Sequence, residues 1–183
     1  IYMQYGWTPK SHFRAAAIIR SMSYDNLTAH KTESEIGWGV LASATFNVMN
    51  CLQVYGQGVY GKGIGQFLND MSLLNVDVVP NPEKEGKMQV LPMMGWFAGM
   101  QYNFSPKVFI TSTYGQSRLY SHDGYPTTPS EQYRYGQYLN ATLFWNITSD
   151  LQVGAEYLRG WRTDFNGDTR HANRMNLAVQ YSF

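Results

Sequence analysis

The chain has 183 residues and a formal net charge of +1, so it is long enough for one domain and carries no excess charge that would indicate a nucleic-acid partner. Its single cysteine, Cys51, excludes an internal disulfide framework and a metal site built from several thiolates. No apolar run approaches the roughly eighteen residues of a transmembrane helix, which argues against a helical membrane protein.

Alternation of apolar and polar residues recurs along the chain and predicts β-strands, because successive side chains of a strand point to opposite faces. Residues 1–6 are interpreted as the end of an earlier strand, so the chain is expected to start in mid-strand. The strands predicted after that fragment span residues 12–25, 36–49, 51–62, 92–104, 107–120, 132–148, 151–163 and 172–183. The clearest is 36–49, where Val40 and Phe46 share one parity and Ser43 has the other.

Short and long connections alternate between these strands. The short turns are predicted at 49–51, 105–106 and 148–150, and the longer polar loops at 26–36, 62–91, 121–132 and 163–171. This asymmetry is typical of transmembrane barrels, which have tight periplasmic turns and longer extracellular loops. The charged stretch 81–87 is expected to be exposed at the surface or folded into a pore. The predicted fold class is therefore all-β, an antiparallel transmembrane β-barrel with at least eight strands in this chain.

The aromatic side chains indicate which face of the strands meets lipid. Trp38 and Trp161 fall near the loop ends of their strands, whereas Trp145, Phe104 and Phe183 fall near the turn ends. Two such belts are expected at the two interfaces of a bilayer, whereas a soluble ligand-binding barrel would concentrate its aromatic residues midway. The apolar face is therefore predicted to point outward and the polar face inward. The terminal aromatic residue resembles the C-terminal signal of outer-membrane barrels, so the bacterial outer membrane is the predicted location.

Arginines supply the candidate functional side chains. The polar face is predicted to carry Arg14, Arg20, Arg134, Arg162 and Arg174. Guanidinium groups attract anions and bind carboxylate or phosphate oxygens through paired hydrogen bonds, so these residues are candidates for an anion-selective pore lining. In the alternative interpretation, Glu156 and the arginines only satisfy one another and brace the wall, with Glu156 paired across strands to Arg174. The sequence leaves both interpretations open.

Glycines also recur on the polar parity, including Gly39, Gly99, Gly136 and Gly154. They are expected either to leave room in a lumen or to ease the curvature of the strands. The sequence does not decide between these two roles.

Two predicted loops carry histidine and aspartate residues of the kind found in enzymes and metal sites: His122 and Asp123 in one, and Asp164, Asp168 and His171 in the other. Their spacing requires neither a nucleophile with an oriented base nor a set of metal ligands. The glycine-rich stretch 56–63 precedes no predicted helix, which excludes a phosphate-binding loop. The prediction is a protein that is not an enzyme, with no catalytic or metal-binding residues and no cofactor.

Four segments carry motifs of a known family. They are HFRAAAIIRSMSY at 12–24, GWGVLASATFNV at 37–48, QVYGQGVYGKGI at 53–64 and VGAEYLRGWRTDFNGDTRHANRMNLAVQYSF at 153–183. The last contains the pattern E-Y-x-x-G-x-R, followed by N-G-D and A-N-R. Together they resemble the C-terminal half of the DcaP-like trimeric porins. The resemblance implies that residues 1–183 are the C-terminal part of a single barrel domain of about sixteen strands. It also implies a homotrimer that takes up small anionic solutes, such as dicarboxylates, by passive diffusion.

Two alternatives to the large porin are a complete eight-stranded outer-membrane barrel with a structural or adhesive surface role, and a soluble eight-stranded ligand-binding barrel. Eight strands leave a lumen only wide enough for side chains to fill. The soluble barrel would require the opposite assignment of the two faces. The expected partners are small anionic solutes, outer-membrane lipid and lipopolysaccharide, and further copies of the chain, but not nucleic acid.

Overall fold

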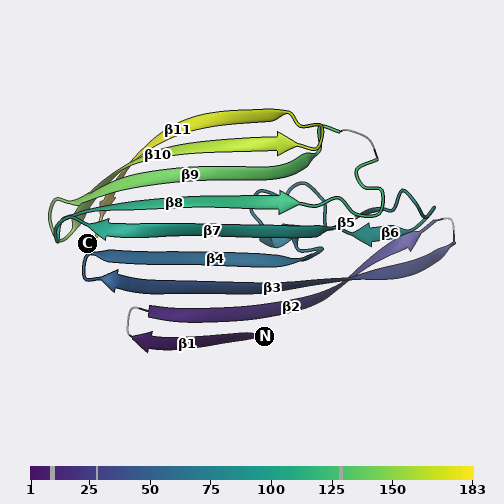
Figure 1. Ribbon diagram of the computed structural model, residues 1–183, viewed down its shortest axis with the longest axis horizontal. Helices are drawn as coiled ribbons and strands as arrows, with labels where there is room; N and C mark the ends of the chain where they lie inside the picture. The colour runs from purple at the N-terminus through teal and green to yellow at the C-terminus, as the bar shows by residue number, and fades with distance from the viewer. Residues whose placement is uncertain (9–10, 28, 128–129) are drawn as a thin grey trace.

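Nine antiparallel strands form one open sheet in the computed structural model, which describes residues 1–8, 11–27, 29–127 and 130–183 (Figure 1). The strands lie in chain order: β1 (Tyr2–Thr8), β2 (Ser11–Asn26), β3 (Lys31–Met49), β4 (Leu52–Lys62), β7 (Pro92–Asn103), β8 (Val108–Leu119), β9 (Tyr133–Asn146), β10 (Leu151–Asp164) and β11 (Thr169–Tyr181). Between β4 and β7 the chain forms a 3-10 turn, η1 (Gly65–Phe67), and a hairpin of β5 (Val78–Pro80) and β6 (Met88–Val90). No helix in the described ranges has the length and hydropathy needed to cross a membrane.

The predicted strands are confirmed, including the N-terminal fragment, which forms β1. Two of the predicted long loops are wrong, because the strands on either side continue into them. The β2–β3 ladder runs on to Asn26 opposite Lys31, and the β10–β11 ladder runs on to Thr163 opposite Thr169. The apolar alternation fades in both places because polar side chains occupy the strand ends. The hydroxyls of Thr163 and Thr169, for example, share a hydrogen bond of 2.8 Å across the strands.

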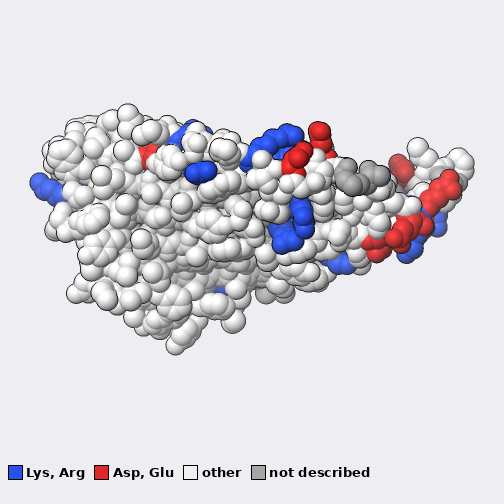
Figure 2. Space-filling view, turned by 45° about the horizontal axis from the view of Figure 1, so that its top comes forward, with Lys and Arg blue, Asp and Glu red and all other residues white. Residues whose placement is uncertain are grey.

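The connections sort to the two ends of the sheet. The tight turns after β3, β7 and β9 lie at one end, on the left of Figure 1, together with the C-terminus; we call this the turn end. The connections from β4 to β7 and from β10 to β11 lie at the opposite end, which we call the loop end. There β2 and β3 project beyond the other strands (Figure 1). In the view of Figure 2, acidic side chains gather toward this projecting end, and most of the surface toward the turn end is uncharged.

One face of the sheet is apolar and exposed. Val40, Phe46, Leu143 and Val179 keep 50%, 45%, 48% and 75% of their surface accessible, so they do not form an enclosed core. The register places polar residues on the opposite side, as where Ser43 of β3 pairs with Gln57 of β4. We call this opposite side the polar face. It consists of the even-numbered residues of β1, β2, β9, β10 and β11 and the odd-numbered residues of β3, β4, β7 and β8, apart from register shifts at the end of β1, the end of β3 and the start of β9.

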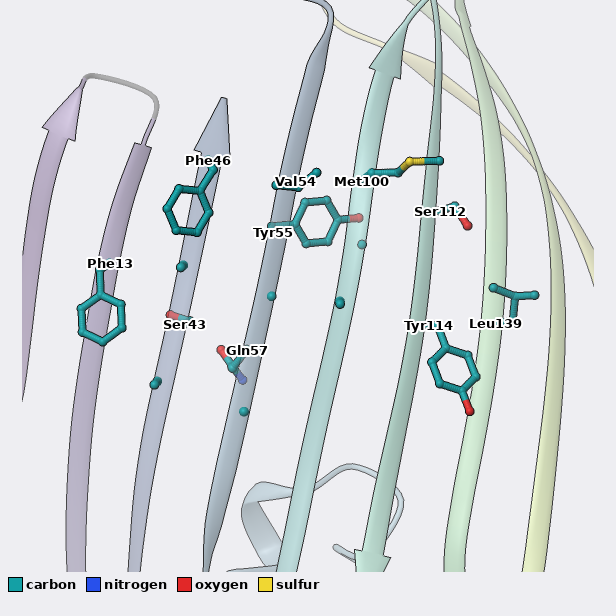
Figure 3. Close-up of a pocket in the computed structure, with 16 residues that line it drawn as sticks. Phe13, Ser43, Phe46, Val54, Tyr55, Gln57, Met100, Ser112, Tyr114 and Leu139 are labelled. Atoms are coloured by element: carbon teal, nitrogen blue, oxygen red, sulfur yellow. The ribbon is translucent and has the colours of Figure 1, made fainter. Parts of the chain in front are cut away.

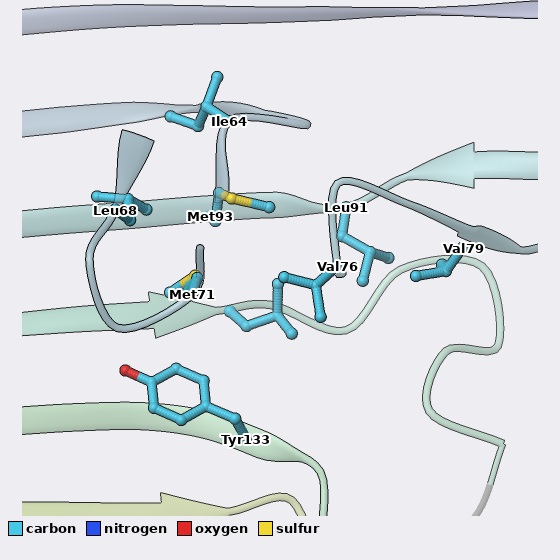
Figure 4. Packing of buried hydrophobic residues seen from close by; sticks show 9 residues of the cluster. Ile64, Leu68, Met71, Val76, Val79, Leu91, Met93 and Tyr133 are labelled. Carbon is cyan, nitrogen blue, oxygen red and sulfur yellow. The ribbon is translucent and has the colours of Figure 1, made fainter. Parts of the chain in front are cut away.

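The buried hydrophobic cluster lies on the polar face near the loop end (Figure 4). It forms where residues 63–91, which we call the inserted segment, fold back over β7, β8 and β9. Its members are Ile64, Leu68, Met71, Val76, Val79, Leu91, Met93, Leu119 and Tyr133. The charged stretch 81–87 was expected either at the surface or folded into a pore, and all of it but its first residue is exposed. The apolar residues that precede this stretch in the inserted segment instead pack against the polar face.

The sheet is not closed into a barrel. β1 and β11 each pair with one neighbour only, so both edges of the nine-stranded sheet are open. The predicted all-β antiparallel class is confirmed, but a complete eight-stranded barrel is not what the chain forms. A ninth strand, β1, is present, and the first and last strands do not meet.

Candidate functional site

An ion pair anchors the inserted segment to the polar face. The Nη1 of Arg20 on β2 donates to the Oδ2 of Asp77 at 2.7 Å and to the carbonyl oxygen of Gly63 at 3.0 Å. The other carboxylate oxygen of Asp77 accepts the backbone N–H of Gly65. Because the two side chains of the pair are only 21% and 19% exposed, solvent and salt screen the pair less than a fully exposed one. Arg20 therefore holds the segment and is not a free cation of the wall.

A second anchor joins the segment to β8 and β9. Ser117 donates its hydroxyl to the Oδ2 of Asp70 at 2.5 Å and contacts the phenolic oxygen of Tyr133. Tyr133 also donates to the carbonyl oxygen of Ser117 at 3.1 Å. These contacts fix the carboxylate of Asp70 over the polar face.

Glycines on the polar face make room for this packing. A Cβ on Gly95 would lie 2.5 Å from the Cδ2 of Leu68, and one on Gly39 would lie 3.0 Å from the Cγ2 of Ile64. Aromatic rings cover three other glycines of this face: Tyr55 covers Gly99, Tyr133 covers Gly136 and Phe144 covers Gly154. The space that the glycines leave is therefore filled by the inserted segment and by rings that lie against the wall.

A groove beside the inserted segment carries two arginines. The register places Arg162 on β10 directly opposite Arg170 on β11. The Nε of Arg162 donates to the Oδ1 of Asp164 at 2.7 Å, and the Asp164 side chain is only 1% exposed. Arg170 is exposed and forms no ion pair with a carboxylate of the described residues. The groove has a volume of about 430 Å³, and Asp70 lines it from the inserted segment.

Arg170 was not predicted as a site residue because it fell within the expected loop 163–171. The strand β11 starts earlier, at Thr169, and so brings Arg170 into the sheet. The parity of the sequence could have revealed it: Arg170, like Arg174, has an even number, and the even-numbered residues of β11 lie on the polar face.

Glu156 and Arg174 both lie on the polar face but form no direct ion pair. The register sets Asn176, and not Arg174, opposite Glu156. Asn176 donates to the Oε1 of Glu156 at 2.7 Å and accepts from the Nε of Arg174 at 2.8 Å, so it links the two charged groups. Asn140 and Thr142 donate to the other oxygen of Glu156 at 3.1 and 3.2 Å. A network of hydrogen bonds therefore replaces the cross-strand ion pair that was expected.

The two remaining predicted arginines differ in position. Arg14 lies on the polar face and donates to the side-chain oxygen of Gln4 on β1 at 3.2 and 2.8 Å. Arg134 departs from the predicted face, because the β9–β10 register slips there and leaves it unpaired in a bulge. Its guanidinium carbon lies 6.0 Å from the ring centroid of Tyr135, which belongs to the apolar face.

The fold has a counterpart among solved structures. The whole chain matches the crystal structure of the outer membrane channel DcaP of Acinetobacter baumannii, with a TM-score of 0.69 and 16% sequence identity. The chain therefore shares the fold of that channel. The chain spans 61% of the length of that protein. No protein-family model and no curated protein sequence matches the chain.

A wide hollow on the apolar face offers different chemistry from the arginine groove. Its volume is about 720 Å³, and Figure 3 shows several of its lining side chains. The lining includes the small residues Ala42, Ala44, Gly56, Gly58 and Ala98 and the larger Phe13, Phe46, Met100, Tyr114 and Leu139. Because none of its lining residues is charged, the groove at Arg162 and Arg170 is the better candidate for binding a polar solute.

The histidines and aspartates of the loops make local contacts. The Nε2 of His122 lies 3.3 Å from the Nζ of Lys62, and its Nδ1 lies 3.4 Å from the Oδ1 of Asp123. Asp164 binds Arg162, as described above. Within the part of the chain that the structure describes, no three His, Cys, Asp or Glu side chains are placed to share a metal ion.

Proposed function

We propose that this chain is part of the wall of an outer-membrane pore, and that small anionic solutes such as dicarboxylates cross the pore by passive diffusion. The observation that carries the proposal is the groove in which Arg162 and Arg170 oppose one another on the polar face. The other face is exposed and apolar, as a surface in contact with lipid requires. Diffusion along a solute gradient needs no cofactor and no source of energy.

The arrangement of the two arginines favours an anion between them. Like charges directly opposite one another on neighbouring strands repel. A carboxylate or phosphate between the two guanidinium groups would relieve this repulsion and accept hydrogen bonds from both. Asp164 fixes the Arg162 guanidinium through its Nε, while Arg170 has no ion-pair partner among the described residues and can engage a solute.

The inserted segment would act as a filter in this pore. It covers part of the polar face near the loop end and presents Asp70 to the groove. A passing solute would therefore meet two cationic side chains and one anionic side chain. This lining favours anions over cations, but more weakly than the arginines would without Asp70.

We infer that further strands complete the barrel. In hydrocarbon, the open edge of a sheet leaves backbone N–H and C=O groups without partners, at several kcal/mol for each group. Strands from outside residues 1–183 are therefore expected to pair with β1 and β11. We further propose, from the resemblance to the DcaP-like trimeric porins, a single barrel domain of about sixteen strands with this chain as its C-terminal part, and three copies in a trimer.

Planar-bilayer recordings of the full-length protein test the proposed function. We expect discrete open-channel steps and, in a salt gradient, a reversal potential that indicates preference for anions. Absence of open-channel current would contradict the pore, and a cation preference would contradict the arginine lining.

A further inference from the structure

Three arginines lie on or beside the apolar face, where charge is costly in a membrane. The register places Arg118 of β8 opposite Tyr135, on the apolar face. Arg159 of β10 shares this face, with its guanidinium carbon 5.0 Å from the ring centroid of Trp161. Arg134 lies in the bulge of β9 beside Tyr135. All three are in the loop-end half of their strands, and an arginine is tolerated at the bilayer interface far better than at the bilayer centre.

Aromatic rings lie against two of these guanidinium groups. The guanidinium carbon of Arg118 lies 5.1 Å from the ring centroid of Tyr120 and 5.8 Å from that of Tyr135. The guanidinium carbon of Arg134 lies 6.0 Å from the same Tyr135 ring. One tyrosine ring is therefore shared by two cations. A cation–π contact orients a guanidinium, but it stabilises the positive charge less than an ion pair with a carboxylate would.

No carboxylate on the apolar face of β7, β8, β9 or β10 balances this positive charge. β7, β8 and β9 contain no Asp or Glu, and the two acids of β10, Glu156 and Asp164, lie on the polar face. None of the three arginines forms an ion pair or a hydrogen bond with another described side chain. The Nε atoms of Arg118 and Arg159 are shielded from solvent and have no partner within the described ranges. The strands therefore supply no acceptor to either Nε atom.

We propose that Arg118 and Arg134, with Arg159 on the adjoining strand, bind the phosphate of a lipid headgroup in the leaflet at the loop end. A lipid phosphate lies at the depth of an aromatic belt and offers several acceptor oxygens to two guanidinium groups. Leu139 and Leu143, which are 39% and 48% exposed on the same face of β9, provide the adjoining surface for acyl chains. The inference rests on the proposed function only in placing the apolar face in a membrane, and it does not depend on conduction.

Binding of bis-phosphorylated lipid A to the full-length protein in detergent, measured by native mass spectrometry, tests this site. The variant R118Q/R134Q should bind the lipid about tenfold more weakly than the unmodified protein, because two charge-assisted contacts are lost. The matched control R14Q/R174Q removes the same charge from the polar face and should stay within about twofold. The variant R118K should retain more binding than R118Q, because it keeps the charge.

Further outcomes distinguish a lipid-binding site from a soluble-anion site and from an interface between copies of the chain. Equal binding by the two double variants, or equal affinity for dephosphorylated lipid A, would overturn the proposal. Displacement of the lipid by inorganic phosphate at similar concentration would assign the arginines to a soluble anion and overturn it as well. Loss of the oligomer with unchanged lipid binding would assign them to an interface between copies, which also overturns it. Single-channel recordings of R118Q/R134Q report separately on the fold and the pore, since unchanged conductance with lost lipid binding is the expected combination.

Discussion

The Nη1 of Arg20 and the Oδ2 of Asp77 lie 2.7 Å apart, although 57 positions separate the two residues in the chain. This pair ties the inserted segment to β2, and Asp77 at the same time accepts the backbone N–H of Gly65. The segment in turn carries Asp70, which lines the groove of Arg162 and Arg170. The shape of the proposed pore lining therefore depends on an ion pair that lies outside the groove.

Replacing Asp77 with Asn should loosen the inserted segment. Arg20 would lose its charged partner in a partly buried setting, and hydrogen bonds to charged groups contribute about 2 kcal/mol. We expect a loss of that order in the free energy of unfolding in urea, together with noisier single-channel current. Arg14→Gln is the matched control, since Arg14 is exposed and its one side-chain partner among the described residues is the neutral Gln4, and it should cost less than about 0.5 kcal/mol. Equal stability of the two variants would contradict the anchoring role.

Gly95→Ala should displace the inserted segment from the wall. The new Cβ would lie 2.5 Å from the Cδ2 of Leu68, which must then move. Overpacking of this kind costs about 1–3 kcal/mol, and the movable leucine tip places the change near the lower limit. Faster proteolysis within residues 63–91 would report the displacement. Gly58→Ala is the control, because its Cβ would meet only Trp96 at 4.0 Å on the apolar face. Identical protease resistance of the two variants would show that Leu68 does not depend on the glycine.

Neutralising Arg170 or Arg162 should weaken the preference for anions. A charge at about 4 Å from a solute in a wet channel contributes about 1 kcal/mol, so each Gln substitution should lower the anion-to-cation permeability ratio by roughly fivefold. Reversal potentials in a salt gradient measure this ratio. Arg159→Gln removes a charge from the opposite face of β10 and should leave the ratio unchanged. A larger shift for Arg159→Gln than for Arg170→Gln would contradict the assignment of faces.

Glu33 of β3 is expected to make a pH-dependent contact. It lies in the part of the β2–β3 hairpin that projects beyond the other strands of the sheet. Its Oε2 lies 2.6 Å from the Nζ of Lys87 in the inserted segment. Hydrogen bonds from Lys87, then Lys31 and Tyr24, lower the pKa of Glu33 from 4.5 to about 2. Because the pKa is depressed in the folded protein, the stabilisation is complete above about pH 4.5 and is lost as the pH falls through about 2.

Side-chain NMR of Glu33 measures this titration directly. Lys87→Gln removes the largest cause of the shift, so the midpoint should move up toward 4.5. The hydrogen exchange of residues 81–90 should also become faster in that variant at neutral pH. An unchanged midpoint in Lys87→Gln would refute the contact.

The strands could be predicted because their cause is local. Each strand separates a polar face from an apolar one, so a period of two is written into residues such as Val40, Ser43 and Phe46. The positions of Arg14, Arg20, Arg162 and Arg174 on the polar face follow from the same parity.

The departures arise where the fold depends on contacts that parity does not encode. A single bulge at Arg134 shifts its side chain from the predicted face, and sequence alternation does not reveal a bulge at a strand end. The path of residues 63–91 is set by partners far away in the chain, such as Arg20 and the space above Gly95. No periodic pattern within the segment reports those partners.

The face of the sheet that meets lipid is tested most directly by spin labels at two positions of β3. In a Cys51→Ser background, Val40→Cys places a label on the apolar face and Ser43→Cys places one on the polar face. In the full-length protein reconstituted into bilayers, the label at 40 should be relaxed by dissolved oxygen and shielded from a water-soluble nickel chelate. The label at 43 should respond to the nickel chelate. A label at 40 that is open to the chelate, together with one at 43 that senses only oxygen, would contradict the membrane pore.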